Sequence, residues 1–495
     1  SPQINNALNS AEENRTELEK VITHYQNSDD TLKLKAALYL IANMEDHSYV
    51  TYNLIDSSGE VVNFNVQEFP NYDSLLKVVE IIEKERGEMD YEKSEKIFDN
   101  KTIKAEFLIE QIESAFKAWR EKPWANNLPY LDFCRYVLPY RGSNEPLEKW
   151  REYFLDKYKD LPDKMLEPTD AIEAANIIND DIKSWFGFDE RYYFHPTDQG
   201  LSEMLENKLG RCEDMTNLTI YAMRANGLAV TSDYTPYWAN TGNNHAWNAI
   251  VKPSGEVIPF MGAESNPGKY KLAYNYAKIY RKMYNQNLSN LIFQERKQEA
   301  IPRWLSGKSY IDVTADYIDV SDVTIKFEQE IPDSIDIAYI CVFNSGKWKP
   351  IHWGWVKNGK AVFTDMVTDI AYLPALYINE EIVPYASPFI LEKDKSIKYL
   401  TPDENSKINA ELTSTTKRKK DKSTEGITKI FLKDGVEYEL FYYKSGWESL
   451  GTAVAGDQPI TFNNIPDNSL LWLVAKGPNR DERIFTYENG QQIWW

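Results

Sequence analysis

The stretch from Gly210 to Glu264 constrains the fold of this chain more than any other part of its sequence. Cys212 follows a glycine closely and opens a segment with apolar residues at helical spacing, and Gly227 ends that segment. Glycine after the last periodic residue is typical of a helix C-cap, because it adopts a left-handed conformation without strain. The pattern therefore predicts a helix that begins at Cys212, with the apolar face Met215, Leu218, Ala222 and Ala225.

The predicted position of Cys212 has a chemical consequence. The first turn of a helix carries unpaired N–H groups and the positive end of the helix dipole, and both favour an anion. A thiol placed there is expected to have a lowered pKa and to lose its proton to form the nucleophilic thiolate. We therefore expect Cys212 to be a reactive cysteine.

Two further elements complete a possible catalytic group. Residues 228–235 alternate as in a strand, and a second strand starts at His245 after a polar loop. A turn returns the chain as an antiparallel neighbour at residues 257–260, and Glu264 comes just beyond it. A nucleophile on a helix with a base and an acid on adjacent strands suits covalent catalysis. The candidate catalytic residues are Cys212, His245 and Glu264.

The chemistry available to these residues is acyl transfer. Cys212 would attack an amide or ester carbonyl, with His245 first as the base and then as the acid that protonates the leaving amine. The oxyanion would bind the backbone N–H of Cys212, and Trp238 is a candidate for the second donor. Transfer to water would make a hydrolase and transfer to an amine a crosslinker, and the sequence leaves both open.

These residues resemble a known family, the transglutaminase-like superfamily, which has a papain-like fold. The resemblance rests on Gly210-Arg211-Cys212, on Arg224-Ala225-Asn226-Gly227 and on His245-Ala246-Trp247, within residues 170–275. It implies that Cys212 is the nucleophile and His245 the base. The helical region before it resembles the N-terminal part of large bacterial secreted members.

The third catalytic residue departs from the family pattern. Many relatives carry Asp directly after the second strand, where Phe260 is followed here by Met261 and Gly262. Glu264 is the nearest carboxylate. The weaker alternatives are Glu256 and Asn248.

The region before this core is predicted to be mostly helical over residues 1–125. Apolar periodicity within 18–25 and 34–44 predicts a helical hairpin, and a pair of strands is expected at 48–56 and 61–69. The core with its preceding helices is assigned to residues 126–300. Within it we interpret one polar group as a tie between helices rather than the lining of a groove: Arg135, Tyr140, Arg141 and Glu145.

From about Pro302 the chain becomes rich in alternating, strand-like runs separated by turn signals. Residues 343–348 and 443–447 form an internal repeat, and in both copies a Phe follows the Trp by 15 residues. We predict two related β-sandwich modules, at 301–395 and 427–495, joined by a polar linker at 396–426. The fold class is multidomain α+β. Most Trp and Tyr side chains are interpreted as core, and stacking of exposed ones on glycan is left open.

Composition excludes several classes of function. A net charge of −20 argues against nucleic-acid binding, which needs clustered Lys and Arg. No apolar run approaches the roughly 20 residues of a membrane-spanning helix. The 3 cysteines lie too far apart for a zinc motif or disulfide framework, and no nucleotide-binding motif occurs, so we expect no cofactor or metal. The other Cys and His residues are interpreted as structural or loop residues: Cys134, Cys341, His24, His47, His195 and His352.

Three functions are consistent with these observations. The first is a secreted cysteine hydrolase that cleaves peptide or related amide bonds. The second is a catalytically degenerate protein that binds protein or glycan in the same groove, and the third is an amine-transferring crosslinker. The sequence starts at Ser1 without a methionine, so we expect a secretory or lipoprotein leader upstream and a secreted, periplasmic or cell-surface location, with a lipid anchor possible in that leader.

Overall fold

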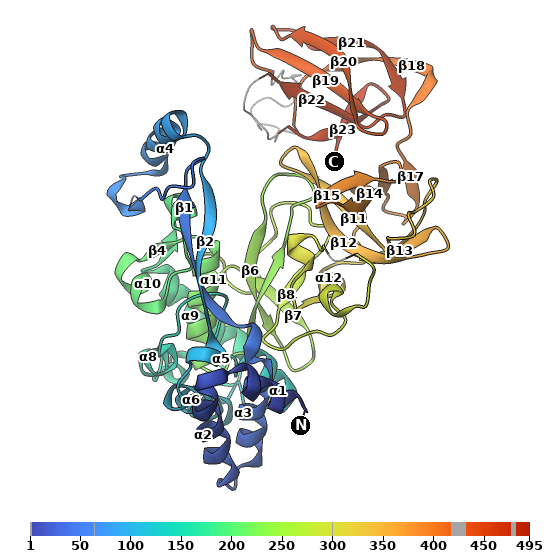
Figure 1. Ribbon diagram of the computed structural model, residues 1–495. Coiled ribbons are helices and arrows are strands. Elements are labelled where there is room, and N and C mark those ends of the chain that lie inside the picture. Colours follow the sequence, from blue (N-terminus) through green and yellow to red (C-terminus); the bar gives the residue numbers. More distant parts are fainter. Residues whose placement is uncertain (1, 64, 299, 417–431, 477–481) are drawn as a thin grey trace.

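The computed structural model describes the whole chain except residues 1, 64, 299, 417–431 and 477–481. It combines helices and antiparallel sheets in separate regions, with helices at the N-terminal end, an α+β core and β-sheets toward the C-terminus (Figure 1). This confirms the predicted multidomain α+β class. The N-terminal helices and the last β module lie at opposite ends of the molecule (Figure 1).

The N-terminal region is a small helical bundle around a shared apolar core. The predicted helical hairpin is present as α2 and α3, and the side chain of Asp30 accepts a hydrogen bond from the backbone N–H of Lys33 (3.4 Å) to cap α3. Leu18, Ile41 and Leu108 lie in the core between these helices. The helices are α1 (Pro2–Ser10), α2 (Arg15–Gln26), α3 (Thr31–Asn43), α5 (Asp99–Thr102) and α6 (Ala105–Glu121).

A long ribbon projects from this bundle and carries α4 (Tyr72–Arg86) at its far end (Figure 1). We call residues 48–98 the N-terminal extension. Its strand β1 (Ser48–Ile55) pairs with β2 (Asp90–Phe98), and the predicted partner at 61–69 contributes only one bridge, between Val61 and Ile55. That pairing prediction was wrong because Val66–Glu68 forms a 3-10 helix, and Asn71 then caps α4 through the backbone N–H of Ser74 (2.9 Å). The strand that pairs with β1 follows α4 in the sequence.

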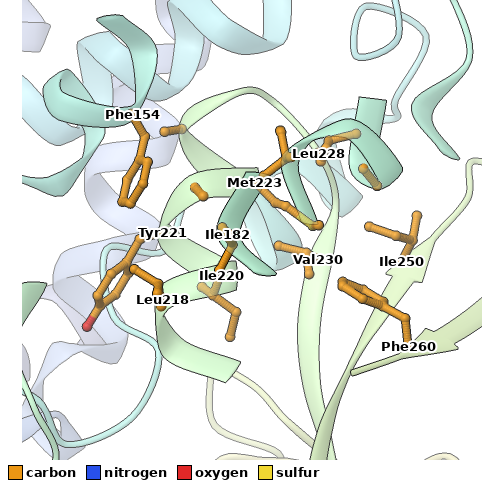
Figure 2. Packing of buried hydrophobic residues seen from close by; sticks show 14 of the residues in the cluster. Phe154, Ile182, Leu218, Ile220, Tyr221, Met223, Leu228, Val230, Ile250 and Phe260 are labelled. Atoms are coloured by element: carbon orange, nitrogen blue, oxygen red, sulfur yellow. The ribbon is translucent and has the colours of Figure 1, made fainter. Parts of the chain in front are cut away.

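The core is built on α11 (Cys212–Ala225) and a five-stranded antiparallel sheet in the order β7-β6-β5-β8-β9. Figure 2 shows Met223 packed against Val230, Ile250 and Phe260. The strands are β5 (Val230–Thr235), β6 (His245–Val251), β7 (Val257–Phe260), β8 (Tyr280–Lys282) and β9 (Tyr310–Asp312). The remaining core elements are α7 (Tyr130–Tyr136), α8 (Trp150–Lys157), α9 (Ala171–Lys183), α10 (Leu201–Asn207), α12 (Thr314–Tyr317) and the short strands β3 (Gly187–Phe188) and β4 (Leu209–Gly210).

Two features of the core bear on the sequence expectations. Strand β9, which we had assigned to the first β module, pairs with β8 and belongs to the core sheet. Arg141 forms a buried ion pair with Asp99 (2.5 Å), and Glu145 accepts the backbone N–H of Gly142 (2.7 Å). The Arg141–Asp99 pair connects two segments, as the structural interpretation of that polar group expects, whereas the Glu145 contact is local to its own loop. Arg141 also lines a cavity, so the alternative interpretation as a groove lining applies to this residue as well.

The two β modules share one strand order, which supports the internal repeat. The eight-stranded sheet of the first runs β10-β13-β12-β11-β14-β16-β17, with β15 paired to β14, and its part β12-β11-β14-β16-β17 matches the five-stranded sheet β20-β19-β22-β23-β24 of the second. The β10-β13 pair of the first matches the separate β18-β21 pair of the second. The first contains β10 (Ser321–Lys326), β11 (Ile337–Asn344), β12 (Lys347–Lys357), β13 (Lys360–Met366), β14 (Ile370–Ile378), β15 (Glu381–Pro384), β16 (Phe389–Leu391) and β17 (Ile397–Tyr399). The second contains β18 (Asp403–Leu412), β19 (Glu437–Tyr443), β20 (Trp447–Val454), β21 (Ile460–Asp467), β22 (Leu471–Ala475), β23 (Ile484–Glu488) and β24 (Gln491–Trp494).

The predicted linker at 396–426 is partly folded. It contains β17 and β18, and the buried Ala410 and Leu412 of β18 pack into the second module. Strand β18 was not predicted because only one of its faces is apolar, as is usual for strands in antiparallel sheets, and the segment therefore has a polar composition. The basic residues 417–420, which we had also placed in the linker, lie outside the described residues.

The aromatic residues of the repeat meet where the two modules touch. The ring of Phe343 lies 5.7 Å from that of Trp447 and 5.3 Å from that of Trp472. The rings of Trp348 and Tyr443 are 6.0 Å apart. These aromatic side chains form a contact between modules, as expected for core residues.

Candidate active site

Cys212 is the first residue of α11, as predicted. The carboxylate of Asp214 accepts the backbone N–H of Arg211 (3.0 Å), which caps the helix start. A Cβ added at Gly210 would lie 2.7 Å from the Cβ of Asp214, so only glycine fits directly before the cap. The Gly-x-Cys spacing therefore follows from the close packing of this turn.

A polar network beneath the cysteine holds the turn in place. Asp214 is fully buried and accepts hydrogen bonds from the backbone (3.0 Å) and side chain (3.1 Å) of Gln199. Arg211 donates to Asp198 (2.7 Å) and to the carbonyl of His195 (3.1 Å). The first turn of α11 is thus fixed from two sides before any substrate binds.

His245 is the first residue of β6, again as predicted, and residues of both β modules fix the loop before it. The side-chain amide of Asn344 donates to the carbonyls of Trp238 (2.9 Å) and Asn243 (2.9 Å). Arg483 donates to the carbonyl of Ala239 (2.8 Å). The imidazole itself stacks near the ring of Trp238, at 5.6 Å between centroids.

One cavity of about 930 Å³ brings the predicted residues together. Cys212, His245 and Glu264 all line it. The rest of its wall is largely aromatic, and the N-terminal extension supplies part of it, since the Tyr91 hydroxyl donates to the carbonyl of Tyr193 (2.6 Å). The aromatic lining consists of Tyr72, Tyr91, Phe188, Tyr193, Phe194 and Tyr274.

The hydrogen-bond partner of His245 is a residue that the sequence did not single out. The Nε2 atom of His245 lies 2.7 Å from the hydroxyl oxygen of Tyr270. Among the described residues, no hydrogen bond joins His245 to Glu264, whose side chain is exposed at the cavity wall. Burial raises the pKa of Tyr270, and so do the nearby charges of Glu264 and Cys212. Tyr270 therefore lies among all three predicted residues.

The protonation states differ from the sequence expectation. Burial, followed by the charge of Glu213, raises the pKa of the Cys212 thiol to about 11, although the thiol sits at a helix start. Burial also lowers the pKa of His245 to about 4. At neutral pH the pair is therefore a neutral thiol and a neutral imidazole. The expected lowering of the cysteine pKa was wrong because removal from water outweighs the helix dipole.

Two residues, Met261 and Gly262, directly follow β7. Gly262 has no room for the aspartate of the family pattern. A Cβ at Gly262 would lie 2.0 Å from Oγ1 of Thr219 and 2.6 Å from Oδ1 of Asn248. Met261 is 2% exposed and lines the cavity beside Cys212. An apolar side chain thus faces the cavity from the strand end where many relatives carry a carboxylate.

The weaker candidates have other partners. Glu256 pairs with Lys252 (2.9 Å) at the turn between β6 and β7. The side-chain amide of Asn248 donates to the carbonyl of Thr216 (3.2 Å) and so joins β6 to α11. The backbone N–H of Trp238 donates to the carbonyl of Asn243 (3.1 Å), so a role for Trp238 as an oxyanion donor would have to use its indole N–H and stays a prediction.

The remaining Cys and His residues are not among the described residues that line this cavity. Cys134 and Cys341 are 3% and 0% exposed, as expected of core residues. A ring nitrogen of His195 lies 2.8 Å from the carboxylate of Glu203. Burial disfavours the charged imidazolium, but the interaction with Glu203 is stronger, and the pKa of His195 is raised. His47 stacks on Tyr284 and His352 contacts the hydroxyl of Tyr280 (3.2 Å).

Among the described residues, no cluster of three or more His, Cys, Asp or Glu is placed to hold a metal ion. In that same part of the chain, no helix combines the length and apolar character needed to cross a bilayer.

Comparison with known proteins agrees with this geometry. Residues 159–260 match the model of a family described as the transglutaminase-like superfamily. This part of the chain is therefore similar to the core of that superfamily. A search of curated proteins found no match. Among solved structures, red sea bream transglutaminase was found at 8% identity and a TM-score of 0.19, over 91% of this chain and 77% of that chain, and a similarity so low adds nothing to the family match.

Proposed function

We propose that this protein is a cysteine hydrolase that cleaves peptide or related amide bonds, with Cys212 of the transglutaminase-like core as its nucleophile. The observation that carries the proposal is that Cys212 and His245 line one cavity from the starts of α11 and β6. Both residues stand on rigid elements whose ends are held by hydrogen bonds, which is what a preorganised catalytic pair requires.

The protonation states define the first step. Because the thiol has a raised pKa and the imidazole a lowered one, His245 takes the proton of Cys212 as the sulfur attacks the carbonyl carbon. In the tautomer whose Nε2–H donates to the hydroxyl oxygen of Tyr270, Nδ1 is the unprotonated ring nitrogen that takes this proton. The imidazolium then protonates the leaving amine, and a thioester on Cys212 remains.

The second step releases the acyl group. Water attacks the thioester carbonyl while His245 removes its proton, and the free thiol is restored. In both steps the N–H groups at the start of α11 would stabilise the oxyanion. Tyr270 would hold the imidazole ring in position, and Glu264 lies close enough to influence Tyr270 through its charge.

The aromatic wall favours substrates that present flat or apolar groups near the scissile bond. Six aromatic residues line the cavity, and they come from the core and from the N-terminal extension. Aromatic rings bury apolar groups and stack on sugar faces or peptide planes. We therefore propose a peptide, protein or glycan-linked peptide as the substrate.

The direct test is a Cys212→Ala variant on a broad panel of peptide and peptidoglycan amides. Loss of turnover by at least about 100-fold is expected, since the nucleophile is removed. Cys134→Ala is the matched control, because it deletes the same atom from a buried cysteine away from the cavity. Unchanged activity in Cys212→Ala would exclude the proposal, and incorporation of a labelled amine would instead identify a crosslinker.

A second candidate function is a binding protein without chemistry. It is favoured by Met261, which faces the cavity from the strand end where many relatives carry aspartate. In this case the panel would show no turnover, while a peptide would still bind, and Met261→Asp would not create activity. Turnover by the unmodified protein rules this candidate out.

We also propose a location outside the cytoplasm. Its support is the resemblance of the domain order to large secreted relatives. Fractionation of cells that express the full natural chain would test it, and recovery in the cytoplasmic fraction alone would contradict it.

A further inference from the structure

A second cavity, of about 490 Å³, lies on another side of α11 and differs from the first in its chemistry. It is lined by residues of the N-terminal region, of the loop after α7, of α11, and of β5, β8 and the segment before β9. Five cationic side chains meet there in a chain whose net charge is −20. They are Lys96, Arg141, Arg224, Lys282 and Lys308. We call this the cationic cavity.

Carboxylates balance some of these charges. Lys308 pairs with Asp46 (2.6 Å), Lys282 with Glu213, and Arg141 with Asp99 (2.5 Å). Asp46 is the one carboxylate among the described lining residues.

Two cations are left without a carboxylate contact. The guanidinium of Arg224 donates to backbone carbonyls, including that of Arg141 (2.8 Å). The nearby carboxylate of Glu145 does not pair with it, because Glu145 accepts hydrogen bonds from the backbone N–H groups of its own loop. Lys96 is exposed and forms no ion pair within the described residues, and its ammonium lies 4.5 Å from the centroid of the Phe98 ring. Arg224 and Lys96 are thus the lining cations without a carboxylate partner among the described residues.

Unpaired polar side chains mark the same place. Ser232 is 2% exposed, and its hydroxyl has no hydrogen-bond partner among the described residues, nor does that of Ser309; both residues line the cavity. Next to them, Asn217 is fully buried with neither side-chain atom bonded, and it lies against the cavity residue Gly142, where an added Cβ would be 2.4 Å from its Oδ1. Buried polar groups nearly always have a partner, so this cluster requires one that is not part of the protein.

We propose that the cationic cavity binds a small oxyanion of the phosphate or sulfate class. Its oxygens would accept hydrogen bonds from the hydroxyls of Ser232 and Ser309 and from the ammonium groups of Lys96 and Lys282. A tetrahedral oxyanion offers several acceptors around one centre, which suits donors that converge from separate elements. The two lining cations that have no carboxylate partner favour an anion over ordered water alone.

The site is independent of the chemistry proposed at Cys212. None of the lining side chains of the cationic cavity lines the aromatic cavity, so loss of catalysis and loss of anion binding can be told apart. One contact links the two, because Lys282 pairs with Glu213, the neighbour of Cys212 in α11.

The experiment is calorimetric titration of the full chain with inorganic phosphate and with sulfate, in chloride of matched ionic strength. Saturable binding is expected. Lys96→Gln should weaken it about fivefold, as expected for a partly exposed charge contact. Lys93→Gln is the matched control, since Lys93 lies on the same strand and lines neither cavity. Ser232→Ala should also weaken binding, through loss of a buried donor.

Three outcomes would overturn the proposal. Absence of saturable phosphate or sulfate binding is the first. Equal weakening by Lys96→Gln and Lys93→Gln would show a diffuse surface effect instead of a site. Binding of citrate without phosphate or sulfate would assign the cavity to carboxylates. The melting temperature of each variant without anion is the check that it folds.

Discussion

The two cavities beside α11 show opposite ways of burying ionisable groups. In the aromatic cavity, Cys212 and His245 are desolvated with little compensating charge, so the pKa of each moves toward its neutral form. In the cationic cavity, burial also opposes the charge of Lys282, but Glu213 outweighs it and the pKa of Lys282 is raised. The same helix therefore borders one cavity in which burial favours the neutral forms of Cys212 and His245 and another in which a carboxylate keeps Lys282 charged.

The difference teaches that a helix start does not by itself make a thiolate. Cys212 has the helix position of a reactive cysteine, yet its nearest charged neighbours include Glu213, which raises its pKa. In the proposed mechanism, His245 therefore has to remove the thiol proton during the reaction. The following predictions test that distinction, in order of decreasing effect.

Replacing His245 by Gln removes the base that a neutral thiol needs. We expect kcat to fall by between about 100- and 10,000-fold, as for other general bases. His24→Gln, at an exposed position in α2, is the control. Full activity in His245→Gln would show that Cys212 is already ionised and would remove the contrast between the cavities.

The alkylation rate of Cys212 measures its protonation state directly. Because burial raises the thiol pKa to about 11, the rate should rise about tenfold per pH unit from pH 7 to 9.5 without a plateau. At pH 7 it should be roughly 300-fold below that of an unstructured thiol with an ordinary pKa near 8.5. Mass spectrometry of the labelled peptide would resolve Cys212 from Cys134. A plateau near pH 8 would contradict the raised pKa.

Tyr270→Phe tests which residue positions the imidazole. Loss of the hydroxyl that bonds Nε2 should lower kcat by about tenfold and change KM little, because the base remains but is less well oriented. Tyr274→Phe is the matched control, because Tyr274 lines the cavity and forms no hydrogen bond with His245 among the described residues. A larger effect from Glu264→Gln than from Tyr270→Phe would return the orienting role to the acid predicted from the sequence.

Features that depend on a single helix or strand could be predicted from the sequence. The Cys212 helix, the strand that starts at His245 and its antiparallel neighbour could be predicted because period and cap residues are local signals. The partner of His245 could not, because Tyr270 lies in an irregular segment whose place depends on tertiary packing. The pairing of β1 with β2 was missed for a related reason, since α4 lies between them in sequence.

The cationic cavity was beyond sequence reasoning altogether. Its cations come from segments as distant in sequence as Lys96 and Lys308, and each looks like an ordinary surface charge. The role of Glu264 and the domain boundaries stay predictions.

The hydrogen bonds from Asn344 and Arg483 to the loop before His245 have an evolutionary consequence. Each β module contributes one side chain to the shape of a segment in the core, so neither module is a freely exchangeable appendage. A recombination event that replaced one module would have to preserve an amide at the first position or a guanidinium at the second. The three parts are therefore expected to be inherited as a unit, and a gene that encodes only the core would lose the support of its own histidine loop.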